Sequence, residues 1–197
     1  MARKGPVTKD TSTIALGLAQ IRIGASAANI NDIHVALVAS DSIGAMANTR
    51  FNGATDWFKL ESGFPLIEDY TTPIREMAAL ECAFKEITPA NMALAYGHDP
   101  ASAPYSTMTV HSGSVPLGDR SAPDYVRMEA VYTYPNGTNF MYIVFPRAQV
   151  SAAVEIDLQS EDAAAVPCNI EGKRADSEVT GGSSVWDSKP LGRIYWE

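Results

Sequence analysis

Hydrophobic and polar residues alternate with a period of two along much of this sequence, and no other feature constrains its fold as strongly. Side chains that alternate in this way point to opposite faces of a β-strand, so that one face can be buried while the other stays polar. The clearest example runs from Tyr125 to Tyr134, with Arg127, Glu129 and Thr133 on the polar face. An Asn136-Gly137 turn follows, which is typical of a β-hairpin. We therefore expect a mainly β chain.

The strand that returns from this turn is apolar on both faces. One face carries Met141, Ile143 and Phe145, and the other carries Phe140, Tyr142 and Val144. A strand with two apolar faces has to be covered on both sides. We expect the second cover to come either from the same domain or from a neighbouring subunit, with Met141, Ile143 and Phe145 as candidate contacts.

Further strands are expected wherever the alternation recurs. Ile33 to Ala39 reads as a half-buried strand, and Gln149 to Leu158 reads as a strand whose second face is small, polar and acidic. Weaker candidates are Ile14 to Ile23, Asp56 to Glu61, Tyr105 to His111, Val166 to Lys173 and Leu191 to Trp196. With residues 74–87, discussed next, the chain is expected to hold about ten strands.

The stretch from Ala54 to Gly97 strings three strand-like runs into a short helix, and it contains one conflict. Residues 74–87 are rich in strong helix formers, so propensity alone predicts a helix there. However, Leu80, Cys82 and Phe84 alternate with more polar residues, which favours a strand. We prefer the strand, because a fresh helix start follows directly and the residue before a proline avoids the helical region.

That fresh start predicts a short α-helix over residues 89–96. Thr88 is a good N-cap residue, and Pro89 suits the first helical position. Gly97 suits the left-handed conformation that ends a helix. The helix therefore has about two turns.

The length of 197 residues suits one domain that buries roughly 70 % of its unfolded surface. We expect residues 1–13 to form an N-terminal arm and residues 14–197 a single β domain with long polar loops at 40–53 and 176–189. Trp186, in the second loop, either docks on another subunit or packs back on its own domain.

Composition excludes several classes of protein. The formal charge of -8 and the sequence pI near 4.9 argue against a nucleic-acid-binding protein, which needs clustered Lys and Arg. Cys82 and Cys168 are far apart in a sequence without a leading signal segment, so we expect a protein made in a reducing cytoplasm. No apolar run approaches the ~20 residues of a membrane helix, so we expect no membrane insertion.

Signatures of catalysis are mostly missing. We find no phosphate-binding glycine loop, nucleophile elbow or paired cysteines at metal spacing. His98, Asp99 and His111 read as loop and strand-end positions, and we expect the histidines to be surface residues rather than metal ligands. Glu155 and Asp157 share one strand face, as a paired acid and base would, but nothing nearby would separate their pKa values. We expect no enzyme, metal or cofactor.

Several segments together resemble the tail tube proteins of bacteriophages. They are the ESGFP turn, the EITPAN helix start, the strands FPRAQVSAAVEIDL and VPCNIEGK, and the closing KPLGRIYW. The resemblance covers most of the chain from about Ile14 onward and rests on the order of these motifs. It implies a β-sandwich or half-barrel with one flanking helix, six copies of which form a ring that closes a continuous β-barrel. Rings then stack into a tube through which the viral genome reaches the host.

The resemblance also implies partners and a lining for the tube. The partners are further copies of the chain, the tape measure protein, the tail terminator and the distal tail or baseplate proteins, in a virion assembled in the host cytoplasm. An acidic or small lining would let DNA slide without specific binding, since Lys and Arg would hold its phosphates. The candidate lining residues are Gln149, Ser151, Glu155 and Asp157, and an outward solvated face is the alternative. A lipocalin-like ligand-binding domain, a hydrolase using Glu155 and Asp157, and the tube of a phage-like contractile particle remain as other readings.

Overall fold

The computed structural model describes residues 15, 17, 19–118, 122–151, 154–156 and 164–197. Within these residues seven strands form one antiparallel sheet that does not close, in the order β1-β4-β5-β6-β3-β2, and β7 pairs with β5. The strands are β1 (Gln20–Ala25), β2 (Met46–Ser62), β3 (Ile67–Phe84), β4 (Val126–Thr133), β5 (Phe140–Val150), β6 (Val166–Gly172) and β7 (Arg193–Trp196). The helices are α1 (Ser26–Asn29), α2 (Pro89–Ala95) and the 3-10 turns η2 (Ala39–Asp41), η3 (Tyr105–Thr107) and η4 (Ser184–Trp186). The prediction of a mainly β chain is confirmed.

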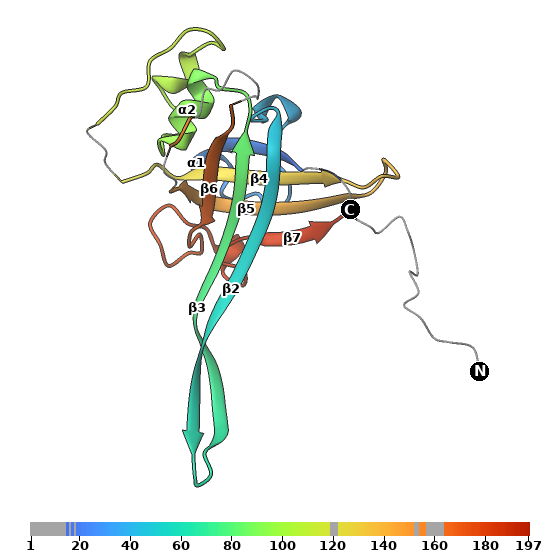
Figure 1. Ribbon diagram of the computed structural model, residues 1–197, viewed down its shortest axis with the longest axis vertical. Coiled ribbons are helices and arrows are strands. Elements are labelled where there is room, and N and C mark those ends of the chain that lie inside the picture. Colours follow the sequence, from blue (N-terminus) through green and yellow to red (C-terminus); the bar gives the residue numbers. More distant parts are fainter. Residues whose placement is uncertain (1–14, 16, 18, 119–121, 152–153, 157–163) are drawn as a thin grey trace, which may run out of the picture.

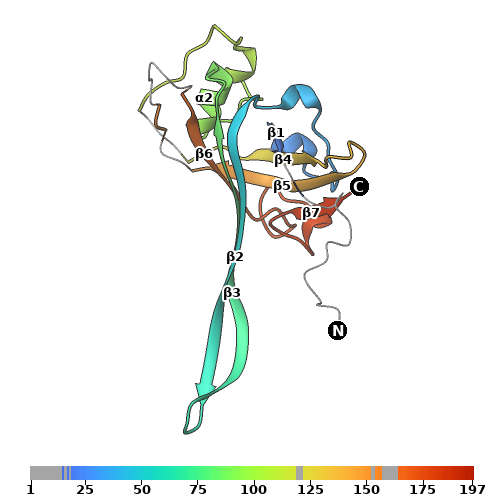
Figure 2. The same cartoon turned by 45° about the vertical axis from the view of Figure 1, so that its right-hand side comes forward.

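The sheet is strongly twisted, so its two halves run in different directions. In Figures 1 and 2, β2, β3 and β6 run steeply across β4, β5 and β7. The main core cluster draws side chains from both halves, among them Leu80 and Phe84 of β3, Met128 of β4, Phe145 of β5 and Ile170 of β6. Right-handed twist accumulates from strand to strand, which allows one sheet to enclose a core in this way.

A second, smaller cluster covers the other face of β5. It contains Ile30, Val144, Ala175 and Trp186, and the Trp186 Nε1 donates a hydrogen bond of 2.6 Å to the carbonyl oxygen of Ile30. The apolar character of both faces of β5 is therefore explained within one chain. The second apolar face of β5 is therefore covered by its own domain, which was one of the two alternatives expected, and not by a neighbouring subunit.

The β4–β5 hairpin forms as predicted, with Thr133 opposite Phe140. Gly137 adopts a φ of 70°, and the Asn136 side-chain oxygen accepts hydrogen bonds from the amides of Thr138 and Asn139. The side chain of Asn136 thus supplies the partners that these two turn amides would otherwise lack.

Residues 74–84 form part of β3, so the preference for a strand over a helix is confirmed. Pairing with β2 on one side and β6 on the other satisfies the backbone, and Leu80, Cys82 and Phe84 point into the main core. Burial against neighbours outweighs the local propensity. Helix α2 follows, where Thr88 Oγ1 accepts from the Asn91 amide at 3.2 Å and Gly97 has a φ of +84°, both as predicted.

Three expected strands are wrong, which accounts for seven strands in the described residues rather than about ten. Residues 33–38 form an extended loop, and residues 105–111 contain η3. Around η3 the Thr107 hydroxyl donates to the Pro104 carbonyl, a local bond that competes with pairing between strands. The expected strand over residues 149–158 also fails: β5 ends at Val150, and residues 151 and 154–156 lie outside any strand.

The expected loop over residues 40–53 is also too long, because β2 begins at Met46. Asn48, Thr49 and Arg50 pair with Ala83, Cys82 and Glu81 of β3. The three strand-like runs expected within residues 54–97 are in fact parts of two long strands. A partner strand that is distant in sequence orders these polar residues, and no local pattern reveals it.

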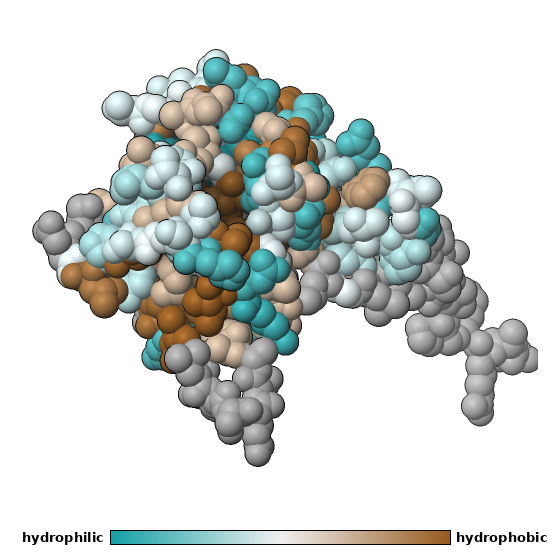
Figure 3. Space-filling view, turned by 90° about the horizontal axis from the view of Figure 1, so that it is seen from above, coloured by the Kyte–Doolittle hydropathy of each residue, from teal (hydrophilic) through white to brown (hydrophobic). Residues whose placement is uncertain are grey.

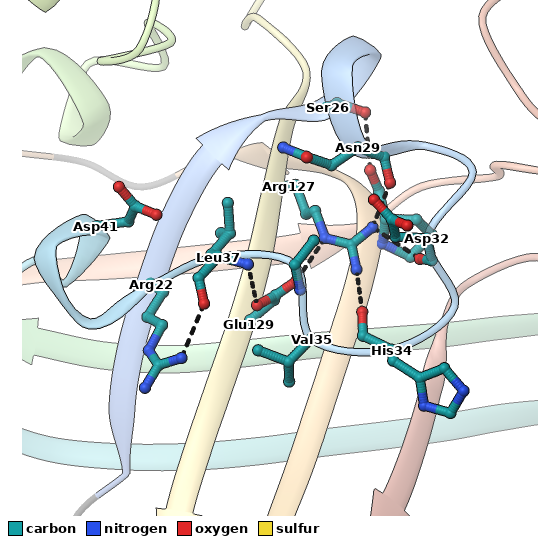
Figure 4. Close-up of polar contacts among 12 residues, drawn as sticks. Arg22, Ser26, Asn29, Asp32, His34, Val35, Leu37, Asp41, Arg127 and Glu129 are labelled. Carbon is teal, nitrogen blue, oxygen red and sulfur yellow. Dashed lines mark hydrogen bonds and ion pairs between the residues drawn. The ribbon is translucent and has the colours of Figure 1, made fainter.

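The loop over residues 29–37 is held by a buried ion pair in place of a strand (Figure 4). Arg127 and Glu129 of β4 both have 0 % of their side-chain surface exposed, and the Arg127 Nε donates to Glu129 Oε1 at 2.6 Å. Arg127 also donates to the carbonyls of Asn29, Asp32 and His34, while Glu129 accepts from the amides of Ala36 and Leu37. The polar face predicted for β4 is therefore buried here, and its two charges supply the hydrogen bonds of the loop above them.

Replacing Arg127 by Met should unfold the chain at much lower urea concentration. The substitution leaves Glu129 buried without its partner and removes donors from three carbonyls, which costs about 3–5 kcal/mol. Urea denaturation followed by circular dichroism measures the change. Arg50→Met, which removes the exposed Arg50–Glu81 pair, is the control and should change the midpoint little. Equal midpoints for the two variants would contradict a supporting role for Arg127.

Candidate functional site

The most unusual surface of the molecule is the outer end of the β2–β3 hairpin, residues 56–75, which we call the arm. Figures 1 and 2 show the arm projecting away from the rest of the sheet. Every residue of the arm is exposed except Thr72, which is half-buried. Strand β2 has 17 residues, and at about 3.3 Å per residue it spans roughly 55 Å. Along most of the arm, β2 and β3 therefore have only each other to pack against among the described elements.

The arm carries many large apolar side chains on this exposed surface. Phe64, at the turn, is fully exposed, and Trp57 is 54 % exposed. The other exposed large hydrophobic residues of the arm are Phe58, Leu60, Leu66, Ile67, Tyr70 and Ile74. Leaving such a side chain in water forgoes about 1.5–3 kcal/mol of burial free energy. Exposed apolar side chains gathered on one element are typical of an interaction surface.

Both long edges of the arm also lack a strand partner among the described residues, because β3 pairs with β6 only from Ala79 onward. Within the described residues β2 pairs only with β3, and the ladder between them is shifted between Asp56 and Trp57 and between Leu60 and Glu61. An edge strand offers a row of free N–H and C=O groups to another chain, and an isolated two-stranded hairpin is marginally stable in water. The alternation of residues predicted only a short strand at 56–61. The missed signal was the presence of adjacent apolar pairs, Trp57-Phe58 and Leu66-Ile67, which place apolar side chains on both faces.

A second surface lies on the side of β2, β3 and β6 that faces away from the core, and we call it the polar face. It consists of Asn48, Arg50, Asn52, Ala79, Glu81, Ala83, Asn169, Glu171 and Lys173. These residues form rows across the strands, such as Asn52, Ala79 and Glu171, with Gln149 of β5 next in register. A shallow cavity of about 420 Å³ lies over part of this face. The face combines small and polar side chains.

Charges on the polar face are largely paired. Arg50 lies 3.6 Å from Glu81, and Lys173 lies 2.6 Å from Glu171. Glu171 also accepts a hydrogen bond of 2.6 Å from the Ser151 hydroxyl. The hydrogen bond from Lys173, followed by that from Ser151, holds the pKa of the Glu171 carboxyl below its usual value. Each carboxylate is therefore placed to neutralise a nearby cation.

Of the candidate lining residues, Gln149 and Ser151 lie at the margin of this polar face, next to Glu171. Ser151 is exposed and bonded to Glu171, whereas the Gln149 amide donates to the Pro123 carbonyl at 2.7 Å. Glu155 is exposed beside Val154, which packs against the main core. Asp157 lies outside the described residues. Glu155 does not lie on a strand. The prediction that Glu155 and Asp157 share one strand face is therefore wrong at Glu155.

Most of the candidate contact residues are directed into their own chain, which corrects that expectation. Ile143 and Phe145 belong to the main core, and Trp186 is fully buried in the smaller cluster. Met141 is half-buried and lies opposite Trp196, which is exposed on β7. A neighbouring copy would find little surface on the three buried side chains. The arm offers far more.

A third surface is a groove of about 450 Å³ beside α2. It is lined mainly by apolar residues, including Ile87, Met92, Tyr96, Leu117 and Ile156. Figure 3 views the molecule from above Figure 1, where α2 lies, and shows apolar residues exposed among hydrophilic ones on this side.

Groups suited to chemistry are scattered in the part of the chain that the structure describes. Its His, Cys, Asp and Glu residues form no cluster of three or more that could hold a metal ion. His98 stacks on Tyr105 and lies 3.9 Å from Asp124, near the surface. None of the described helices has both the length and the apolar character needed to cross a membrane.

Comparison with known proteins adds no family to this description. The chain matches no family model, and a search of curated proteins found no match. Inference about function therefore rests on the surfaces described above.

The lowered pKa of Glu171 has a measurable consequence. A carboxyl whose pKa falls on folding stabilises the folded chain above its unfolded pKa, and this contribution is lost as the pH falls through the lower folded value. Lys173→Met should raise the pKa of Glu171, and Ser151→Ala should raise it less, because Lys173 is the larger cause. Carboxyl carbon NMR during an acid titration measures both. Lys59→Met on the distant arm is the control, and an unchanged Glu171 titration in Lys173→Met would contradict the assignment.

Proposed function

We propose that this chain is a structural subunit that assembles with copies of itself into a tube of the bacteriophage tail type. Six copies close a ring, rings stack, and the viral genome passes through the bore. The chain carries out no catalysis and holds no cofactor in this role. The resemblance of the motif order to tail tube proteins and the surfaces of the folded chain support the proposal independently.

The observation that carries the proposal is the arm. Its exposed apolar residues and its free β2 edge would favour aggregation in a protein that stayed monomeric. In an ordered assembly a neighbouring copy covers both, so the same features become stabilising. The arm also reaches far beyond the core, and a subunit that has to contact neighbours beyond its own body needs such a reach.

In the proposed ring, the arm of one copy contacts a different surface of the next copy. A contact between two different patches of identical subunits is heterologous, and it closes into a ring when its rotation divides a full turn. The open, twisted sheet would act as one section of a sandwich or half-barrel, whose edges continue into the sheets of the neighbours. Closure of this kind removes the exposed edges.

The polar face is the part of the chain best suited to line the bore. Its two cations, Arg50 and Lys173, are paired with carboxylates, which leaves them less available to DNA phosphates. Each phosphate contact contributes to salt-dependent binding, so a lining with neutralised cations lets a duplex move. Ser151 and Glu155 would stand at the margin of this lining. The lining of the bore would then be locally neutral, and not acidic as expected from the sequence.

The remaining parts of the proposal concern location and partners. The tube would belong to the virion tail, assembled in the host cytoplasm, and would meet a tape measure protein, a tail terminator and distal tail or baseplate proteins. A tube of a phage-like contractile particle uses the same surfaces. A lipocalin-like domain has less support, because the interior positions of this sheet are filled by core side chains.

Replacing Phe64 and Leu66 together by Ser should prevent assembly while leaving the subunit folded. These side chains are exposed at the tip of the arm, so their loss should leave the core unchanged and remove apolar contact area from the interface. Electron microscopy should show hollow tubes or six-fold rings for the natural chain and none for the variant. Circular dichroism should give the same melting temperature for both.

Leu117→Ser is the matched control, because Leu117 is exposed near α2 and away from the arm. Tubes formed by this control but not by the arm variant would support the proposal. Tubes formed equally by all three proteins would remove the arm from the interface. A natural chain that stays monomeric at high concentration would overturn the proposed function as a whole.

A cysteine placed at Ser151 tests the lining. Cys82 and Cys168 are buried, so Ser151→Cys would be the accessible thiol among the described residues. In assembled tubes a small maleimide should enter the bore and label it, whereas a maleimide on a bulky polymer should not. Both reagents should label the unassembled chain. Labelling of tubes by the bulky reagent, measured by mass spectrometry, would place Ser151 on the outer wall.

A further inference from the structure

Two cysteines that are far apart in sequence lie side by side in the main core. Cys82 of β3 and Cys168 of β6 are register partners on adjacent antiparallel strands. Both thiols are free, and the residues are only 4 % and 3 % exposed. Both side chains belong to the main core cluster, so they point to the same side of the sheet. The sequence separation of the two residues gave no sign of this pairing.

Their positions suit a covalent link. Residues directly opposite each other in an antiparallel pair have Cα atoms about 4.5–5.5 Å apart, inside the range of about 4.4–6.8 Å that a disulfide spans. Both side chains also pack in the same core cluster, so the thiols face the same interior space. The backbones of β3 and β6 therefore do not have to change their pairing before the two sulfur atoms can bond.

The native core protects this pair from reaction. The hydrogen bond to Cys82, together with burial, raises the pKa of the Cys168 thiol far above its usual value. Because the thiolate is the reactive form, a buried thiol in apolar surroundings is inert. Reaction therefore requires the strands around the pair to open.

One side of the pair is weakly held. Strand β6 pairs with β3 along residues 166–171, but it pairs with β5 only at residues 170–172. Beyond that ladder, the Ser151 amide donates to the Asn169 carbonyl. In the described part of the chain, the half of β6 that contains Cys168 thus makes few backbone hydrogen bonds on the side that faces β5. Local opening should begin at such an end.

We propose that Cys82 and Cys168 are a latent disulfide pair, which cross-links β3 to β6 when a small oxidised disulfide reaches the thiols during local opening. The link would join the strand that carries the arm to the strand that completes the polar face. It is independent of the proposed assembly, because it concerns the core of one chain.

The reaction is two consecutive thiol–disulfide exchanges. The thiolate of one cysteine attacks a sulfur of the small disulfide, breaks its S–S bond and expels one small thiolate. The second cysteine thiolate then attacks the protein sulfur of this mixed disulfide and expels the other small thiolate. The protein loses two protons and two electrons in all, and the small disulfide is reduced to two thiols.

Oxidised glutathione provides the test. The full-length chain is incubated with it over a series of urea concentrations below the unfolding transition, alkylated, and digested without reductant. Mass spectrometry should find Cys82 and Cys168 in one cross-linked peptide pair, with an intact mass about 2 Da lower than that of the reduced chain. The rate of cross-linking should rise with urea, because local opening limits it.

The oxidised chain should then unfold at a higher urea midpoint than the reduced one, because the link restricts the unfolded chain. Cys82→Ala and Cys168→Ala are the controls, and neither should yield the cross-linked peptide. A chain that carries only glutathione adducts or only links between chains would overturn the proposal. A cross-link that lowers the urea midpoint would also overturn it, because the native register would then not fit a disulfide.

Discussion

The pairing of β3 with two different strands is the constraint on which the rest of the structure depends. Strand β3 has 18 residues, and its second half lies between β2 and β6, with Leu80, Cys82 and Phe84 in the core. Its first half extends into the arm, where β2 is the only partner among the described strands. The β2–β3 ladder, with its shifts in register, therefore joins an exposed hairpin to a packed core. The stability of the subunit and its capacity for contact reside in two halves of the same strand.

Buried charge plays a complementary part on the other side of the sheet. Arg127 and Glu129 take the place of a neighbouring strand for the loop that follows α1, because they provide donors and acceptors for its backbone. Such a pair adds little net stability compared with an apolar core, but loss of either member is expensive. The pair thus acts mainly to specify one path for this loop across β4. The loop then contributes Ile30 to the cluster that buries Trp186.

Local signals predicted the parts of the fold that depend on neighbours in sequence. The β4–β5 hairpin, helix α2 with its Thr88 cap, and the strands β6 and β7 all carry their own turn, cap or alternation. The strand predicted for Ile33 to Ala39 is wrong, because the pattern of this segment alternates as in a strand while its backbone bonds to Arg127 and Glu129. The full length of β2 was also hidden, since polar residues such as Asn48 and Arg50 are ordered only by β3. The adjacent apolar pairs Trp57-Phe58 and Leu66-Ile67 signal apolar side chains on both faces of the arm. A strand covered on both sides has the same pattern, so only the folded chain shows that these faces are exposed.

The separation of arm and core has a consequence for the rate at which copies would associate. A two-stranded hairpin without cover is marginally ordered, so the first contacts between free subunits must fix its backbone before they gain much from it. A subunit that joins the end of an existing tube meets a neighbour whose arm is already fixed. The entropy lost when its own arm is ordered is then offset by more contacts. Under the proposed function, starting a new tube is therefore slow, whereas growth of an existing one is fast. The marginal arm would thereby limit the number of tubes that begin, and a pre-formed starting platform would decide where they grow.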